Sequence, residues 1–279
     1  MTSPSRSRPV VVGVDTRDSA QSALAWAADE AERRGAQLRL VHAEPPTHRR
    51  PQGTGHRALD EAAAFLSRRN PGLDIALVLE DEGSPARVLC HHSRGARLIV
   101  LGSRRLNRIE EFLSANSVAV PVSAQAACPV VVVLAPESAA EPTPYLVVGV
   151  DGSPASHAAL AHAFETAATR DADVLALWVW QPSLLESTDE VVVLQKCRRL
   201  LFEAVTEHAA TYPDVAVTRQ VVRGHPVEEL AKASEDALAV VVGRRGRGGF
   251  TGMRLGSVPH GLLHRAHCPV ITVPAPDAD

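Results

Sequence analysis

Two halves of this chain repeat one another, and the repeat limits the folds that it can adopt. Residues 10–15 (VVVGVD) recur as residues 146–151 (LVVGVD), a displacement of 136 (151 − 15). Residues 127–130 (ACPV) recur as residues 267–270 (HCPV), a displacement of 140 (268 − 128). Because the order of apolar and polar segments between these matches is the same, the sequence predicts two similar domains. We place them at 1–135 and 145–279, joined by a proline-containing linker at 136–144.

Each half alternates short β-branched runs with amphipathic, alanine-rich stretches, which is typical of a parallel sheet covered by helices. The sequence therefore predicts an α/β fold with two tandem doubly wound domains, each an open five-stranded parallel sheet flanked by helices. The expected strands are 9–14, 37–43, 73–80, 97–102, 129–134, 145–150, 173–180, 215–222, 238–242 and 269–273. The expected helices are 19–34, 55–69, 85–94, 116–127, 154–169, 189–211, 226–235 and 257–266.

A glycine-rich, cationic loop follows the predicted strand at 238–242. It holds Arg244, Arg245, Arg247 and Arg254 without a carboxylate, and it ends at Gly256-Ser257 where a helical pattern begins. Glycines let main-chain N–H groups approach an anion closely, and a helix N-terminus adds free donors and a favourable dipole. Ligands of doubly wound sheets bind at the carboxyl ends of the strands, where Asp151 also lies. The loop therefore predicts a phosphate-binding site.

The spacing of these residues resembles the ATP-binding form of the universal stress protein family. That form carries Gly, two residues, Gly, nine residues and then Gly-Ser or Gly-Thr, which Gly243, Gly246, Gly256 and Ser257 match without a gap. Residues 148–153 (VGVDGS) and 268–273 (CPVITV) are also typical of the family, and the resemblance extends over both halves. No Gly-x4-Gly-Lys-Ser/Thr motif is present, which excludes the P-loop class.

The resemblance implies roles for eight residues of the second half. Asp151 would lie beside the adenine edge and Val179 would line the base. The ribose would be bordered by Val242 and Gly243, and the phosphates would be held by Gly246, Gly256, Ser257 and Val258. ATP, with Mg²⁺, is the implied ligand. Pro259 departs from the family pattern, because that position is commonly hydroxylated.

The first half departs further from the motif. Gly102 matches the first glycine, but Arg105 replaces the second and Ala115-Asn116-Ser117 replaces the final Gly-Ser. Glu110 and Glu111 add negative charge to the same loop. A side chain at a position of close approach and carboxylates near a triphosphate both oppose binding. We therefore expect weak or absent nucleotide binding in this half, although Asp15 is retained.

Several of these residues have simpler interpretations. Asp151 could turn the chain into the following helix, and the arginines could be solvated or contact RNA. Trp178 and Trp180 share one face of their strand, so they are core, pocket wall or a stacking surface for a base. The spacing of His264, His267 and Cys268 does not favour a zinc site. Cys128 and Cys268 each precede proline and a strand, which indicates a shared packing role.

Composition narrows the function further. Hydrophobic residues make up 45% of the chain, charged residues 22%, and the net charge is −3, which argues against a general nucleic-acid binder. The longest apolar run is too short to cross a bilayer, and the first nine residues lack a signal-peptide pattern. We expect a cytoplasmic protein without membrane or nucleic-acid partners. No catalytic constellation and no metal-binding set is recognisable.

Three functions remain open from the sequence. The first is a nucleotide-dependent regulatory role in a stress response, with an unidentified protein partner. The second is a slow ATPase or phosphotransferase, and the third is a structural module without a ligand. The apolar last strands, 130–134 and 270–273, are open edges that invite pairing. The family resemblance implies that they meet antiparallel, which would make the chain an internal pseudo-dimer, and whole chains could form homo-oligomers through another surface.

Overall fold

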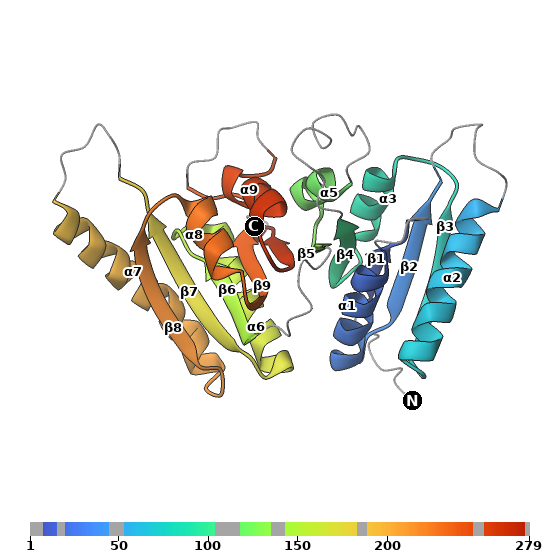
Figure 1. The fold of residues 1–279 in the computed structure, drawn as a ribbon, viewed down its shortest axis with the longest axis horizontal. Coiled ribbons are helices and arrows are strands. Elements are labelled where there is room, and N and C mark those ends of the chain that lie inside the picture. Colours follow the sequence, from blue (N-terminus) through green and yellow to red (C-terminus); the bar gives the residue numbers. More distant parts are fainter. Residues whose placement is uncertain are drawn as a thin grey trace. The chain divides into compact units, whose positions relative to one another are not determined.

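The structure is a computed structural model that describes residues 8–15, 20–44, 53–103, 118–134, 143–182, 189–247 and 254–276. The chain divides into two compact units, Met1–Ala135 and Pro136–Asp279. Strands and helices alternate along each unit, and Figure 1 shows the elements in sequence colours.

The first unit contains a five-stranded parallel sheet in the order β3-β2-β1-β4-β5. Its central strands carry fully buried valine, leucine and isoleucine side chains, as expected of a parallel sheet covered on both faces. Its strands are β1 (Val10–Gly13), β2 (Leu38–Ala43), β3 (Ile75–Glu80), β4 (Leu98–Ser103) and β5 (Val130–Leu134). Its helices are α1 (Ala20–Arg33), α2 (Thr54–Arg69), α3 (Pro85–His92) and α5 (Ala119–Gln125).

The second unit repeats this topology, with the parallel order β10-β9-β6-β7-β8. Its strands are β6 (Thr143–Gly149), β7 (Asp173–Trp180), β8 (Val217–Arg223), β9 (Ala237–Gly243) and β10 (Val270–Val273). Its helices are α6 (Pro154–Arg170), α7 (Glu190–Thr211), α8 (Pro226–Ala233) and α9 (Ser257–Arg265). The predicted fold class, two tandem doubly wound α/β domains, is confirmed. The predicted pairing of the last strands concerns the relation between the units and stays a prediction.

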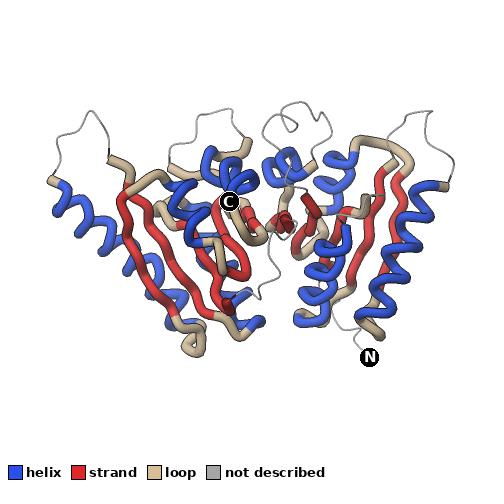
Figure 2. The backbone as a smooth tube through the Cα atoms, in the orientation of Figure 1, coloured by secondary structure: helices blue, strands red, loops and turns tan. Residues whose placement is uncertain are grey.

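The helices lie in two layers around each sheet (Figure 2). In the second unit α6 packs beside α7, and α8 packs beside α9. Right-handed crossovers put α6 and α7 on one face of the sheet and α8 and α9 on the other. This follows because the strands after β6 are added toward one edge of the sheet, and the strand after β9 is added toward the opposite edge. The carboxyl ends of β6 and β9 therefore form the topological switch point, where doubly wound sheets bind ligands.

Small differences from the expected element ends have local causes. The strand expected from 215 begins at Val217, because Val215 belongs to a turn in which its N–H donates to the carbonyl of Tyr212 at 3.2 Å. The helix expected to reach 127 ends at Gln125, since Ala126 already has an extended backbone ahead of the Cys-Pro pair.

A buried serine in each unit explains the repeated Cys-Pro segments. The hydroxyl of Ser93 donates to Cys90 O at 2.7 Å and accepts from Ala127 N at 2.8 Å. The hydroxyl of Ser234 donates to Ala231 O at 2.6 Å and accepts from His267 N at 2.9 Å. Each serine thus ties the end of one helix (α3 or α8) to the residue before the cysteine. The buried thiols, Cys128 and Cys268, follow these contacts directly, and burial raises the pKa of Cys128 to about 12. The predicted packing role of these cysteines is confirmed.

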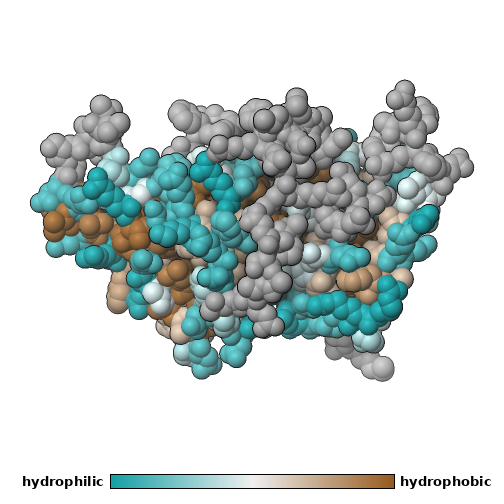
Figure 3. Space-filling view, in the orientation of Figure 1, coloured by the Kyte–Doolittle hydropathy of each residue, from teal (hydrophilic) through white to brown (hydrophobic). Residues whose placement is uncertain are grey.

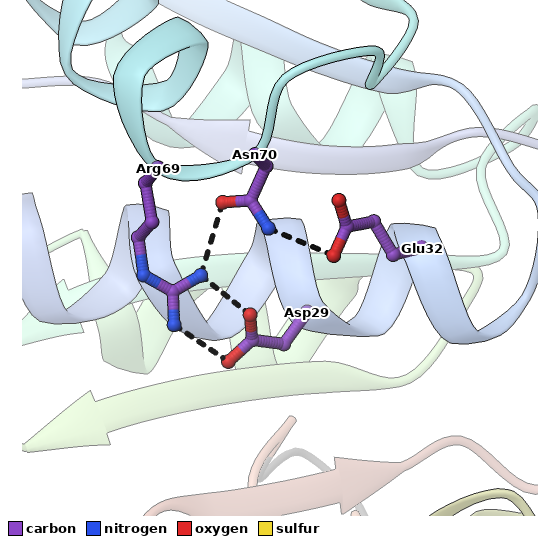
Figure 4. A network of polar contacts seen from close by, with 4 residues as sticks. All are labelled: Asp29, Glu32, Arg69 and Asn70. Carbon is purple, nitrogen blue, oxygen red and sulfur yellow. Dashed lines mark hydrogen bonds and ion pairs between the residues drawn. The ribbon is translucent and has the colours of Figure 1, made fainter.

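A polar network joins α1 to the end of α2 in the first unit (Figure 4). Arg69 Nη2 donates to Asp29 Oδ2 at 3.1 Å, and Arg69 Nη1 also donates to Asn70 Oδ1 at 3.0 Å. The amide of Asn70 donates in turn to Glu32 Oε2 at 2.8 Å. Because Asn70 is buried, these contacts satisfy its amide and fix the packing of the two helices.

Exposed apolar side chains gather on α7, where the space-filling view shows brown surface (Figure 3). Val191 is 60% exposed, Val192 57% and Phe202 56%. The guanidinium of Arg219, from β8, lies 5.0 Å from the centre of the Phe202 ring and covers part of it. The helix therefore buries one stripe against the sheet and leaves the opposite side exposed.

We predict that His208 makes the second unit less stable in mild acid. This side chain lies between α7 and α6, stacked on Phe164 with ring centres 5.7 Å apart. Burial lowers its pKa, with His157 acting in the same direction and Glu207 opposing. As the pH falls through the ordinary histidine pKa, the unfolded chain therefore takes up a proton before the folded chain does, and stability is lost. Urea midpoints between pH 8 and 5 should fall in the wild type and fall less in His208→Gln.

The exposed His56 of α2 provides the control. His56→Gln should keep the wild-type dependence on pH. Equal slopes for His208→Gln and the wild type would contradict the prediction.

Candidate nucleotide site at the switch point

The loops after β6 and β9 contact one another directly. Asp151 follows β6, and its Oδ2 accepts a hydrogen bond of 3.0 Å from the main-chain N–H of Arg247, which follows β9. These residues are 96 positions apart in sequence. The expected convergence of the Asp151 turn and the Gly243 loop at one edge of the sheet is confirmed.

Asp151 also shapes the turn into α6. Its Oδ1 accepts from the N–H of Ser153 at 2.9 Å, and the Ser153 hydroxyl caps the helix by accepting from Ser156 N at 3.2 Å. Burial by itself raises the pKa of Asp151, but hydrogen bonds from Ser153, Arg247 and Ser156 outweigh it and hold the pKa below its ordinary value. Asp151 is therefore an ionised acceptor at neutral pH. The simpler interpretation of this residue, a turn former, is observed, and a contact with a base stays a prediction.

Two glycines of the loop are required by close packing within the protein. A Cβ on Gly243 would lie 2.7–2.9 Å from atoms of Ala155 in the first turn of α6. A Cβ on Gly246 would collide with Oδ2 of Asp151. A Cβ at Gly243 would require backbone atoms to shift, and a Cβ at Gly246 would displace the end of the Asp151 side chain, so these glycines let the loop after β9 approach the turn after β6.

The N-terminus of α9 presents free hydrogen-bond donors. Gly256 is the N-cap residue, and its N–H donates to Arg244 O at 2.9 Å. Among the described residues, nothing accepts a hydrogen bond from the N–H groups of Ser257 and Val258. Pro259, the next residue, has no N–H to offer. Within the part of the chain that the structure describes, two main-chain donors and the exposed Ser257 side chain are therefore available to an anion.

Four arginines belong to the loop that leads from β9 to α9. Arg245, Arg247 and Arg254 are exposed, and Arg244 is half-buried with its N–H bonded to Val273 O at 2.7 Å. The positive end of the α9 dipole adds to their charge. The described part of this loop can thus attract an anion of several charges.

The remaining predicted site residues have mixed environments. Val179 is half-buried near the end of β7. Val242 is 3% exposed, and its Cγ1 lies 3.1 Å from the point where a Cβ on Gly149 would lie. Its side chain therefore belongs to the core, so only the main chain of Val242 is available to a ribose.

The altered loop of the first half lies outside the described residues, which stop at Ser103 and resume at Val118. The comparison of Arg105, Glu110, Glu111 and Asn116 with the second half therefore stays a sequence prediction. Within the described residues, no three His, Cys, Asp or Glu side chains are placed to hold a metal ion. No helix in this part of the chain has the length and apolar character that crossing a membrane requires.

We predict that Gly246→Ala destabilises the second unit because the new methyl group displaces Asp151. Loss of the Asp151–Arg247 hydrogen bond should cost about 1 kcal/mol in the free energy of unfolding, measured with urea. Gly256→Ser is the matched control, since a Cβ there would have ordinary contacts of 3.4–3.5 Å and serine is a favoured N-cap residue.

The cost of Gly246→Ala should shrink in an Asp151→Ala background, because the displaced carboxylate is then absent. An unchanged cost in that background would contradict the explanation.

Comparison with known proteins agrees with this architecture. The family model described as the universal stress protein family matches residues 6–133 and 145–274. The chain is 34% identical over 292 residues to Universal stress protein Rv2005c of Mycobacterium tuberculosis, covering 97% of this chain and 98% of the relative. It is 35% identical over 292 residues to Universal stress protein Rv2623 of the same species, with the same coverage.

Among solved structures, a universal stress protein from Archaeoglobus fulgidus DSM 4304 is similar in fold. The TM-score is 0.71 at 17% identity, and the match covers 97% of each chain. With two family matches that together span nearly the whole sequence, the chain belongs to the universal stress protein family as a tandem two-domain member.

Proposed function

We propose that the second domain binds ATP at the switch point and that its occupancy regulates a protein partner in a stress response. The observation that carries the proposal is the pair of N–H groups at Ser257 and Val258, which have no acceptor among the described residues and follow the cationic loop that Asp151 holds in place. The spacing of Gly243, Gly246, Gly256 and Ser257 supports the same ligand through the family resemblance. The proposed setting is the cytoplasm, without nucleic acid or membrane as partner.

The polyphosphate would bind to the α9 N-terminus. The two N–H groups and the Ser257 hydroxyl donate to phosphate oxygens, and the arginines of the loop neutralise the charge. Mg²⁺ would bridge phosphate oxygens and neutralise part of the remaining charge. Pro259 supplies no donor at the third helical position, so the first turn of α9 offers two N–H groups rather than three.

The base would lie on the side of Asp151 and Val179. Oδ1 of Asp151 accepts from the N–H of Ser153 and Oδ2 from the N–H of Arg247, and the side chains of Ser153 and Ser156 also stabilise the carboxylate. A carboxylate has about four acceptor positions in all, and the amino group of adenine would donate to one of them. The same carboxylate would then connect the base to the loop that holds the phosphates.

Calorimetric titration with ATP tests the proposal, and we expect a stoichiometry near one per chain. Substitutions of Ser257, the first residue of α9, test whether the phosphates bind at this helix N-terminus. Ser257→Ala removes the hydroxyl and should weaken binding about ten-fold, since hydrogen bonds to charged groups contribute roughly 1.5 kcal/mol or more. Ser257→Pro also removes an N–H and should weaken binding about a hundred-fold.

Proline suits this position, because it is favoured at the start of a helix and Gly256 before it has an extended backbone (φ −69°, ψ 161°). The melting temperature of Ser257→Pro should therefore match that of the wild type. Wild-type affinity in Ser257→Pro, or a stoichiometry near two, would overturn the assignment of the site.

We also expect the phosphates to supply most of the binding energy. ATP should bind much more tightly than AMP, Mg²⁺ should strengthen ATP binding, and added salt should weaken it, because exposed charges are screened. Titrations of both nucleotides at two salt concentrations measure these effects. Equal affinities for ATP and AMP would place the energy in the base pocket instead.

A further inference from the structure

The guanidinium of Arg247 lies on the base side of the proposed site. Gly152, directly after Asp151, has a positive φ of 75° and no side chain to fill the space beside it. Arg247 Nη2 and Cζ lie 3.2 and 3.3 Å from the point where a Cβ on Gly152 would lie. Cη2 of Trp178, near the end of β7, lies 3.2 Å from the same point. Because Gly152 has no side chain, the guanidinium and the indole edge both border the space beside this turn.

Other contacts constrain the main chain of Arg247 and the side chain of Trp178. The main chain of Arg247 is fixed by its hydrogen bond to Asp151 Oδ2. Trp178 is 7% exposed, and its side chain hydrogen-bonds to Cys197 of α7. Burial raises the pKa of Cys197, while the positive charges of Lys196 and Arg247 oppose that rise, which agrees with a guanidinium turned toward α7. The guanidinium of Arg247 and the indole edge of Trp178 thus lie near one another beside the Asp151 turn.

Binding of a base beside Asp151 would change the position of the Arg247 side chain. A base beside Asp151 needs the space over the turn that the guanidinium fills, so the side chain must turn away when a base binds. A triphosphate offers the displaced cation new partners in its oxygens. A nucleoside offers none.

We propose that Arg247 is a specificity-determining residue that occupies part of the base side in the ligand-free protein and thereby favours nucleoside triphosphates over nucleosides. The inference rests on the proposed ATP site and goes beyond it, because it assigns opposite effects on the two ligands to one side chain. The same cation lowers the affinity for a bare nucleoside and raises the affinity for a triphosphate.

Titration of Arg247→Ala with adenosine and with ATP tests this assignment. Adenosine should bind about three-fold more tightly than to the wild type, because the guanidinium no longer has to be displaced from the space beside Gly152. ATP should bind about ten-fold more weakly, because a charge-assisted contact is lost. Arg245→Ala is the matched control: it removes an exposed arginine of the same loop, so ATP should weaken and adenosine should not change.

Fluorescence of Trp178 gives a readout that needs no ligand. The chain has three tryptophans, so Trp26→Phe with Trp180→Phe leaves Trp178 alone. In this background Arg247→Ala should shift the emission to the red as the indole edge meets water, and Arg245→Ala should leave the emission unchanged.

The outcomes separate this inference from the proposed function. If the wild type binds neither adenosine nor ATP, both fail together. If ATP binds but Arg247→Ala weakens adenosine or leaves its affinity unchanged, the proposed function stands and the inference is overturned. An unchanged Trp178 emission in Arg247→Ala would likewise refute the contact itself.

Discussion

The hydrogen bond between Asp151 and the N–H of Arg247 is the interaction on which the candidate site depends. It joins the ends of β6 and β9, the two adjacent strands whose chains leave in opposite directions. A sheet of this topology leaves a crevice at that point, but it does not by itself determine how the two loops approach. The ionised carboxylate supplies that constraint, because it accepts from the loop after β9 with one oxygen and from the α6 turn with the other. The N–H donors of α9 and the arginines of the loop after β9 then lie at the same edge of the sheet.

The glycines of this loop combine two requirements. Gly243 and Gly246 are needed by contacts within the protein, with Ala155 and with Asp151. The family pattern assigns the same two positions to the ribose and the phosphates. Packing and ligand binding make the same demand on these positions. A backbone without side chains can lie close to the neighbouring turn, and its N–H groups can also lie close to a ligand in the crevice. A glycine motif in a sequence therefore cannot by itself separate packing from binding.

Much of the fold could be predicted from the sequence, because its signals are local. The repeated β-branched runs and the prolines at 85 and 226 correspond to strands and to the first residues of α3 and α8. The serines at 93 and 234 gave no such signal, since each acts through a hydrogen bond to a residue more than thirty positions away. Arg247 was predictable as a loop cation but not as a partner of Trp178, because that contact depends on the empty space at Gly152. Long-range contacts of this kind have no periodicity that a sequence could display.

The two domains differ in more than their glycine motifs, as a comparison of equivalent positions on β2 and β7 shows. Val10 pairs with Leu38, and the repeated Leu146 pairs with Val174, so His42 occupies the position of Trp178 four residues along the strand. His42 is buried, with Nδ1 2.8 Å from Val14 O. In place of Trp180 stands Glu44, which accepts from the N–H of Gly55 at 2.9 Å.

The first turn of α2 thus lies close against this end of the first sheet, since a Cβ on Gly55 would lie 2.8 Å from His42 Cδ2. Where the second domain has an indole edge beside a guanidinium, the first has an imidazole and a carboxylate in contact with a helix. The two domains therefore differ in the described residues at the end of this strand, independently of the altered glycine loop.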